Sequence, residues 1–491
     1  MKKALLWAIS ILLLSQNPSH ASDARVDSMG GLTLVATDEA DDVNPFTLGN
    51  PAGLALLAPQ SRFDVGAQWV KEYFPPSQDE FHVYGLMNDL DSDNVKYHGL
   101  IAFLSKDWAI QADGDTRHTE GEDNLSSNQA TNDRTRGTFK TAYNFGPFTL
   151  GGQIQPSQSN IVFKDYLLTA APNSEVLGGT GTANTLVSTG GLLLNLLGSN
   201  NPKQDHLRIG GVVSIPLSPS QEIDNLPVSN TLTTNTLTLT EKTTEQNALT
   251  WGPEIYFDSP GSFELGLIGR FSTFDIYFEQ DSTNTGSIAN VPNFKDQTGT
   301  VAAGIAILKI TTPVTDGMNL KTGGFFSVEN ANTSGFLPSG NANGGVSVTG
   351  WSGQLGVGFE HPQDYTIGVQ ASLSGVTGSE GNSSAVTTTN NFLDYKISVG
   401  GEHWLSKTWA LRVGVVYEDA NNKGTAEQNQ LLFPVDPGEE IITTAIVAGL
   451  GYDDSKLKFD LNLSTAQPTL VNDPSGYGNI YGAQCAAALI F

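Results

Sequence analysis

Residue types that could do chemistry are few and scattered in this sequence. Asp89, Asp91 and Asp93 match the start of a calcium-binding loop, but Asn94 stands where that loop needs Gly and Leu100 where it needs Glu. We therefore interpret this stretch as an ordinary acidic loop.

Catalytic motifs are also missing from the sequence. There is no G-x-S-x-G nucleophile elbow, no H-E-x-x-H zinc motif and no cysteine spacing typical of a metal site, and the single cysteine is Cys485. The histidines beyond the N-terminal region are far apart along the chain: His82, His98, His118, His206, His361 and His403. We expect a protein that is not an enzyme and that uses no cofactor or metal.

The N-terminus has the form of an export signal. Lys2 and Lys3 precede an apolar run over residues 4–14, and Ser19-His20-Ala21 fits the small-x-small pattern of a cleavage site. The apolar run is too short to span a membrane as a helix, and no later run is long enough. Residues 1–21 are therefore predicted to be a signal peptide that directs export.

The chain is strongly acidic, with a formal net charge of −26. This charge makes nucleic acid an unexpected partner, and it argues against membrane contact through a basic patch. Acidic residues cluster in probable loops at 38–42, 89–93 and 120–123. The interpretation that follows is a solvated, negatively charged outer surface.

From residue 62 to the C-terminus the dominant pattern is alternation with a period of two. Leu457, Phe459 and Leu461 alternate with polar residues, and residues 63–69 repeat the pattern. This periodicity predicts β-strands with one apolar face. With 38% hydrophobic residues, 53 glycines and no linker, the chain is typical of a transmembrane barrel that shows one face to lipid and one to the lumen. We expect an all-β fold, with an antiparallel barrel over residues 62–491.

The connections between these strands are of two kinds. Short turns rich in Asp, Ser, Pro and Gly lie between aromatic residues, as with Phe145 and Phe148 or Trp404 and Trp409. Aromatic rings favour the membrane–water boundary, so these turns are predicted to lie at one rim of the barrel. Longer polar stretches are predicted to be loops at the opposite rim: residues 116–136, 280–297, 330–347, 375–391 and 419–440.

The C-terminal segment looks like a final barrel strand. One face carries Tyr481, Ala483, Cys485, Ala487, Leu489 and Phe491, and Phe491 is the last residue. A terminal strand ending in Phe resembles the signal read by the barrel assembly machinery of the outer membrane. Tyr481, Leu489 and Phe491 are therefore predicted to direct assembly into the outer membrane of a Gram-negative cell, with its lipid as a partner.

Two motifs rich in small residues lie before the first predicted strand. They contain Gly30 and Gly31, and then Asn50, Pro51, Ala52 and Gly53. Over about thirty residues this segment resembles the N-terminal signature of the FadL/TodX family, outer-membrane transporters of hydrophobic compounds such as long-chain fatty acids. The resemblance implies a luminal plug over residues 22–61, whose Asn-Pro-Ala turn meets the barrel wall near the ligand site. Residues 38–42 are more acidic than the family pattern.

The resemblance and the turns predict different numbers of strands. The family resemblance implies 14 strands, whereas the turns allow about 16 to 18 if residues 229–240 form a strand, and bacterial barrels have even numbers.

Some predicted strands are apolar on both faces, namely residues 100–104 and 301–308. In a barrel the second face must point to the lumen or to the plug. Two interpretations stay open: an apolar lumen for passage of a hydrophobic ligand, or packing against the plug.

A run of leucines lies in what we expect to be a long connection between residues 155 and 206. It consists of Leu192, Leu193, Leu194, Leu196 and Leu197. An exposed apolar loop usually marks a binding surface, so the run is a candidate hydrophobic capture loop. The alternative is that it folds inward or contacts another copy.

The function that these patterns predict is passive uptake of hydrophobic small molecules, fatty acids or aromatic hydrocarbons, through a plugged porin-like barrel in the outer membrane. A surface-protein shuttle or scaffold of a secretion system, or a porin for polar solutes, remains the alternative. The sequence does not identify the ligand.

Overall fold

The computed structural model describes residues 21–35, 50–57, 60–73, 90–123, 129–167, 175–198, 204–230, 236–284, 297–315, 317–335, 344–362, 364–382, 388–422, 440–454, 456–470 and 479–491. The predicted signal peptide, the acidic residues 38–42 and Asp89 lie outside this part, except that Ala21 begins a short helix. Among the described residues, no helix is long and apolar enough to cross a membrane.

The described chain folds into a closed antiparallel barrel of 18 strands. Each strand pairs with its neighbours in sequence, and pairing of β1 with β18 closes the sheet. The strands are β1 (Gln60–Tyr73), β2 (Leu90–Leu104), β3 (Trp108–Asp123), β4 (Gln129–Asn144), β5 (Phe148–Leu167), β6 (Glu175–Leu197), β7 (His206–Asn230), β8 (Thr236–Ser259), β9 (Phe263–Asn284), β10 (Gln297–Thr315), β11 (Met318–Gly335), β12 (Gly344–His361), β13 (Tyr365–Asn382), β14 (Thr388–Trp404), β15 (Trp409–Asn422), β16 (Glu440–Asp453), β17 (Leu457–Leu470) and β18 (Asn479–Ile490).

The period-two pattern explains the two surfaces of the wall. On β17, Leu461 and Leu463 are exposed on the outer face, whereas Asp460 and Asn462, which alternate with them, are buried on the inner face. Large apolar side chains are exposed in the same way along strands all around the barrel. A sheet that is apolar outside and polar inside reverses the pattern of a soluble protein.

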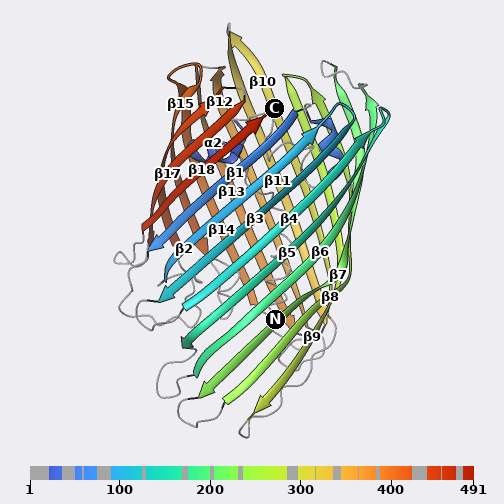
Figure 1. Cartoon of the computed structure of the whole chain (residues 1–491), viewed down its shortest axis with the longest axis vertical. Coiled ribbons are helices and arrows are strands. Elements are labelled where there is room, and N and C mark those ends of the chain that lie inside the picture. Colours follow the sequence, from blue (N-terminus) through green and yellow to red (C-terminus); the bar gives the residue numbers. More distant parts are fainter. Residues whose placement is uncertain are drawn as a thin grey trace.

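Short connections gather at one end of the barrel, beside the C-terminus (Figure 1). Gly146 and Gly261 lie in these turns with positive φ angles of 93° and 73°, a conformation that disfavours other residues. Aromatic residues flank these turns as predicted, and their rings touch: Phe145 with Tyr143 and Phe148, Phe257 with Phe263, and Trp409 with Tyr452.

Two predictions about the wall are wrong. The barrel has 18 strands and not the 14 that the resemblance implies, and this number lies within the range of strand numbers that the turns allow. Strands also extend into the stretches predicted as long loops: β3 continues to Asp123 and β4 begins at Gln129, both inside the predicted loop 116–136. These strand ends are polar on both faces, so their sequence shows no alternation of apolar and polar residues. Within residues 229–240, β7 ends at Asn230 and β8 begins at Thr236.

The described N-terminal segments contact the inner face of the wall. They contain helix α2 (Ala21–Ser28) and the 3₁₀ turn η1 (Pro51–Leu56). Leu54 and Ala55 of η1 pack on Leu100, Ala102 and Leu104 of β2. For residues 100–104, therefore, the second apolar face packs against the N-terminal segment.

Candidate functional site

The Asn-Pro-Ala turn is built as its residue types dictate. Asn50 caps η1, because its side-chain oxygen accepts a hydrogen bond from the N–H of Ala52 at 3.0 Å. Pro51 occupies the first helical position, where its missing N–H costs nothing. The Gly53 N–H donates to the Asn50 carbonyl at 3.0 Å. The turn is therefore a rigid unit, and its residues Pro51 to Ala55 are buried.

A pair of glycines on the wall makes room for this turn. Gly151 of β5 and Gly191 of β6 face each other across the ladder on the inner face. A Cβ on Gly151 would lie 2.6 Å from the Cα of Ala52, and a Cβ on Gly191 would lie 3.0 Å from the Cδ of Pro51. We call Gly151 and Gly191 the inner glycine pair. Only residues without a side chain allow the backbone of the turn to approach the wall this closely.

The other end of the Asn50 side chain is held by a buried ion pair. Its amide nitrogen donates to Oε2 of Glu254 on β8, and Nη2 of Arg270 on β9 donates to Oε1 of the same carboxylate. The Glu254 side chain is fully buried. A buried carboxylate needs such partners, because an unpaired charge in this position would be strongly destabilising. Asn50 thereby links the N-terminal segment to two strands of the wall.

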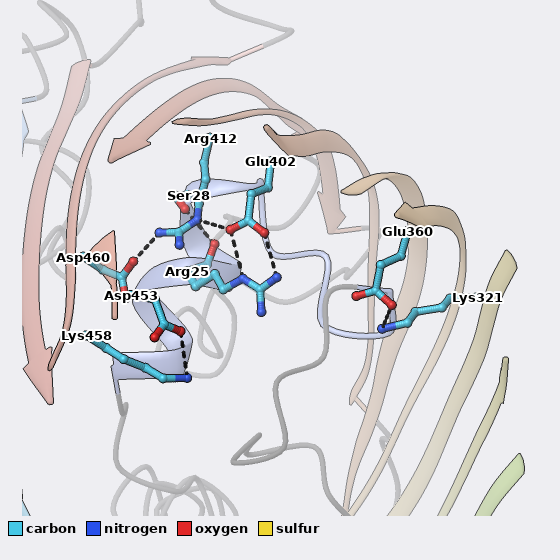
Figure 2. Close-up of polar contacts among 9 residues, drawn as sticks. All are labelled: Arg25, Ser28, Lys321, Glu360, Glu402, Arg412, Asp453, Lys458 and Asp460. Atoms are coloured by element: carbon cyan, nitrogen blue, oxygen red, sulfur yellow. Dashed lines mark hydrogen bonds and ion pairs between the residues drawn. The ribbon is translucent and has the colours of Figure 1, made fainter. Parts of the chain in front are cut away.

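Helix α2 is attached through a second ionic network (Figure 2). Arg25 binds Glu402 of β14 through two bonds, Nε–Oε2 at 3.1 Å and Nη2–Oε1 at 2.8 Å. Arg412 of β15 donates to Glu402 at 2.6 Å and also to Asp460 of β17. The side chain of Glu402 is fully buried and that of Arg25 is 13% exposed. Because two arginines share one carboxylate, the helix is tied to a network that the wall has already formed.

The predicted glycines Gly30 and Gly31 follow α2 with φ angles of 77° and 80°, which only glycine adopts easily. The backbone of Met29 and Gly30 lies on Gly400 of β14 and Gly414 of β15, where any Cβ would be closer than 3.0 Å to it. Gly400 and Gly414 also face each other across the ladder. Both N-terminal motifs thus rest on opposed glycines of the wall.

An apolar stripe follows the inner face of β10 from Val301 to Ile307. At one end, Ile305 packs against the cluster that includes Ala52 of the turn. At the other end, Val301 packs with Phe274 of β9 and with residues of β8 and β11. For residues 301–308, the inner face is therefore apolar beyond its contact with the described N-terminal turn.

The wall beside this stripe has an irregular ladder. The pairing of β7 with β8 stops after Ser214 and resumes only at Ser220, and the intervening chain contains Pro216 and Pro219, which lack an N–H to donate. On β8 the register shifts between Gln246 and Leu249. Ala248 in this shifted segment contacts the Phe274–Val301 cluster. The ladder is thus interrupted next to the apolar inner cluster.

The leucine run predicted as a capture loop lies elsewhere. Residues Leu192 to Leu197 belong to strand β6, near the end with short connections, so the loop assignment is wrong. Leu192, Leu194 and Leu196 point outward and are 38%, 43% and 53% exposed, and Leu197 is also exposed. Leu193 points inward, is completely buried, and packs on Ala52. The run is apolar on both faces because one face meets the outer surface and the other meets the N-terminal turn.

The C-terminal residues lie where the alternation predicts. Tyr481 and Leu489 are exposed on the outer face of β18, and Phe491 follows it. Phe491 exchanges two backbone hydrogen bonds with Ser61, at 3.0 and 3.3 Å, next to the closing pair of strands. Their role in assembly stays a prediction.

The sequence reasoning missed the wall residues that hold the two motifs: Gly151, Gly191, Glu254, Arg270, Gly400, Glu402, Arg412, Gly414 and Asp460. A usable signal was a charge at an inner position between small and apolar inner residues of the same strand, as with Arg412 between Ala410 and Gly414 of β15. A buried charge of this kind requires a partner on another element.

Solved FadL-type transporters are among the structures that this chain resembles. A FadL homologue from Pseudomonas aeruginosa has a TM-score of 0.39 and 8% identity, with 97% of this chain and 99% of that one covered. The toluene transporter TbuX of Ralstonia pickettii has a TM-score of 0.38 and 12% identity, with 97% and 100% covered. The ferric citrate transporter FecA has a TM-score of 0.41 and 10% identity, with 88% and 79% covered.

No family model matches the sequence, and no curated protein matches it. TM-scores in this range carry no argument about function.

Proposed function

We propose that this protein is an outer-membrane barrel that admits hydrophobic small molecules passively, with residues 22–61 as a plug. The outer face supports the membrane location, because large apolar side chains are exposed along the strands and aromatic rings cluster at the end with short connections. In bacterial barrels the short turns face the periplasm, so the longer connections would face outward.

One observation carries the proposal: the apolar inner stripe of β10. It leads from the Phe274–Val301 cluster to the Asn-Pro-Ala turn, in a place where a porin for polar solutes would have polar side chains. A hydrophobic molecule that leaves water gains about 25 cal/mol per Å² of apolar surface buried there. The stripe therefore offers such a molecule a favourable path through an otherwise polar lumen.

The plug and the irregular ladder suggest how the molecule would enter and leave. Docked on the inner glycine pair, the turn closes the end of the stripe, and its release would open the path. The interrupted pairing between β7 and β8 lies beside the Phe274–Val301 cluster, with Ile215 and Leu217 exposed outside. A ligand on the stripe would leave sideways through this seam into the apolar layer of the membrane. No energy source is needed for such movement.

The test compares two isosteric substitutions. Val301→Thr puts a hydroxyl on the inner stripe, whereas Val328→Thr makes the same change on the outer face of the neighbouring strand β11, where Val328 is 40% exposed. We would measure uptake of radiolabelled decanol by Gram-negative cells that produce each variant. An unpaired hydroxyl in an apolar site costs about 1–3 kcal/mol, so uptake through Val301→Thr should fall at least fivefold.

Val328→Thr should leave the uptake unchanged, since its side chain is not on the path. Equal uptake by cells with and without the wild-type protein would refute transport of hydrophobic compounds. A stable protein partner purified with such an inactive barrel would favour the scaffold class, and a large open-state conductance for ions would favour the polar porin.

A further inference from the structure

One acidic side chain of the inner face lies beside the apolar stripe. Glu329 of β11 lies directly across from Ala303 of β10 and Gly350 of β12. Its neighbours along β11 on the same face are Ser327 and Ala331, and Ala331 belongs to the Phe274–Val301 cluster. A carboxylate therefore stands on a surface of small and apolar side chains.

Glu329 has no hydrogen bond or ion pair within the described part of the chain. The nearest cation in the register is Arg270, two strands away on the same row, with Ala303 between them. Strands lie about 4.8 Å apart, which puts the two Cα atoms about 10 Å from each other. Arg270 is turned away, because its guanidinium donates to Glu254 and to the carbonyl of Gly269.

Five other cations attached to the inner face are paired with carboxylates. The pairs are Arg25 and Arg412 with Glu402, Lys321 with Glu360, Arg62 with Asp64, and Arg136 with Asp115. A carboxylate ligand beside Glu329 would therefore meet its negative charge with no cation at the directly opposite positions of β10 and β12. A ligand with an ammonium group would meet an unpaired partner there.

We propose that Glu329 makes the stripe selective for hydrophobic amines. Amines would bind most tightly, uncharged compounds less tightly and fatty-acid anions least tightly. The apolar body of such a ligand lies on Phe274, Val301 and Ala331, and its ammonium group donates to the Glu329 carboxylate. This inference rests on the proposed transport of hydrophobic compounds and specifies the class of substrate. It departs from the fatty acids that the family resemblance implies.

The test uses three probes with the same ten-carbon chain: decylamine, decanol and decanoate. Binding to the full-length protein is measured by calorimetry in an uncharged maltoside detergent at pH 8.5. Because the probes also enter micelles, wild type and variants are compared at one detergent concentration. Glu329→Gln removes the charge with little change in shape. Asp394→Asn is the matched control, since Asp394 is another half-buried carboxyl on the inner face, three strands away on β14.

Wild type should bind decylamine at least tenfold more tightly than decanoate, with decanol between them. Glu329→Gln should reduce that ratio to threefold or less and leave decanol within twofold of its wild-type affinity. Asp394→Asn should keep the wild-type ratio. The inference is overturned if decanoate binds wild type as well as decylamine does, or if Asp394→Asn lowers the ratio as much as Glu329→Gln. If none of the probes binds, decanol included, the proposed transport itself fails.

Discussion

A single methyl group on the inner glycine pair should release the Asn-Pro-Ala turn. In the Gly151→Ala variant the new Cβ would lie 2.6 Å from the Cα of Ala52, whereas ordinary contact begins at 3.4 Å. The turn must therefore retreat from the wall by about 1 Å, since it is backbone and not a flexible side chain that blocks the methyl group. Such a shift also pulls Asn50 away from Glu254.

The cost follows from two losses. Overpacking a tight contact costs about 1–3 kcal/mol, and a hydrogen bond to a charged group contributes about 1.5–3 kcal/mol. Partial relaxation makes the two overlap, so we expect about 3 kcal/mol in favour of the undocked turn. Since 1.4 kcal/mol corresponds to a factor of ten, the undocked fraction should rise about 100-fold.

The control is built into the same two strands. Gly152 and Gly190 face each other on the outer side, one residue away from the inner pair, and an added Cβ meets nothing within 4 Å at either position. Single-channel recording in planar bilayers measures how long each barrel stays in a high-conductance state. Gly151→Ala should raise that time about 100-fold, and Gly152→Ala should not change it.

The reasoning fails if Gly151→Ala conducts like wild type while its barrel is intact on a semi-native gel. It also fails if Gly152→Ala opens the barrel equally often, because the effect would then come from the strand and not from the contact with the turn.

Two further predictions concern the other contacts of the N-terminal segments. Glu402→Ala should raise the open time far more than Arg25→Ala, because it leaves Arg25 and Arg412 without their shared carboxylate. That loss costs about 3–5 kcal/mol. Equal effects of the two variants in the same single-channel recordings would contradict the network. Leu193→Ala should destabilise the protein by about 2–5 kcal/mol, because it leaves a cavity beside Ala52. Leu192→Ala on the outer face should have a small effect. Thermal unfolding in detergent at one scan rate compares the stabilities of the two variants.

The sequence predicted the barrel well where one face of a strand is apolar and the other polar. Leu461 and Asp460 show this contrast, and they lie on opposite faces as expected. The same logic failed at Leu192 to Leu197, since a strand that touches the outer surface on one side and the N-terminal turn on the other has no alternation. It failed again at residues 116–136, where both faces are polar.

Only the N-terminal half of the candidate site could be predicted from the sequence, and its partners on the wall could not. Asn50, Pro51 and Ala52 carry local signals, because capping and turn formation depend on neighbours in sequence. Their partners Glu254 and Arg270 come from β8 and β9, and the choice of those strands depends on the three-dimensional register of the barrel. A glycine that makes room for another segment, such as Gly191, looks in sequence like any other glycine of a strand.

The ionic attachment of α2 also sets the order in which the molecule matures. Arg25 lies near the beginning of the described chain, but its partner Glu402 follows 377 residues later. Arg412 and Asp460, which complete the network, come later still. Contacts this distant in sequence form late. Helix α2 therefore stays undocked until nearly the whole wall is in place. A docked helix indicates that the barrel has been completed.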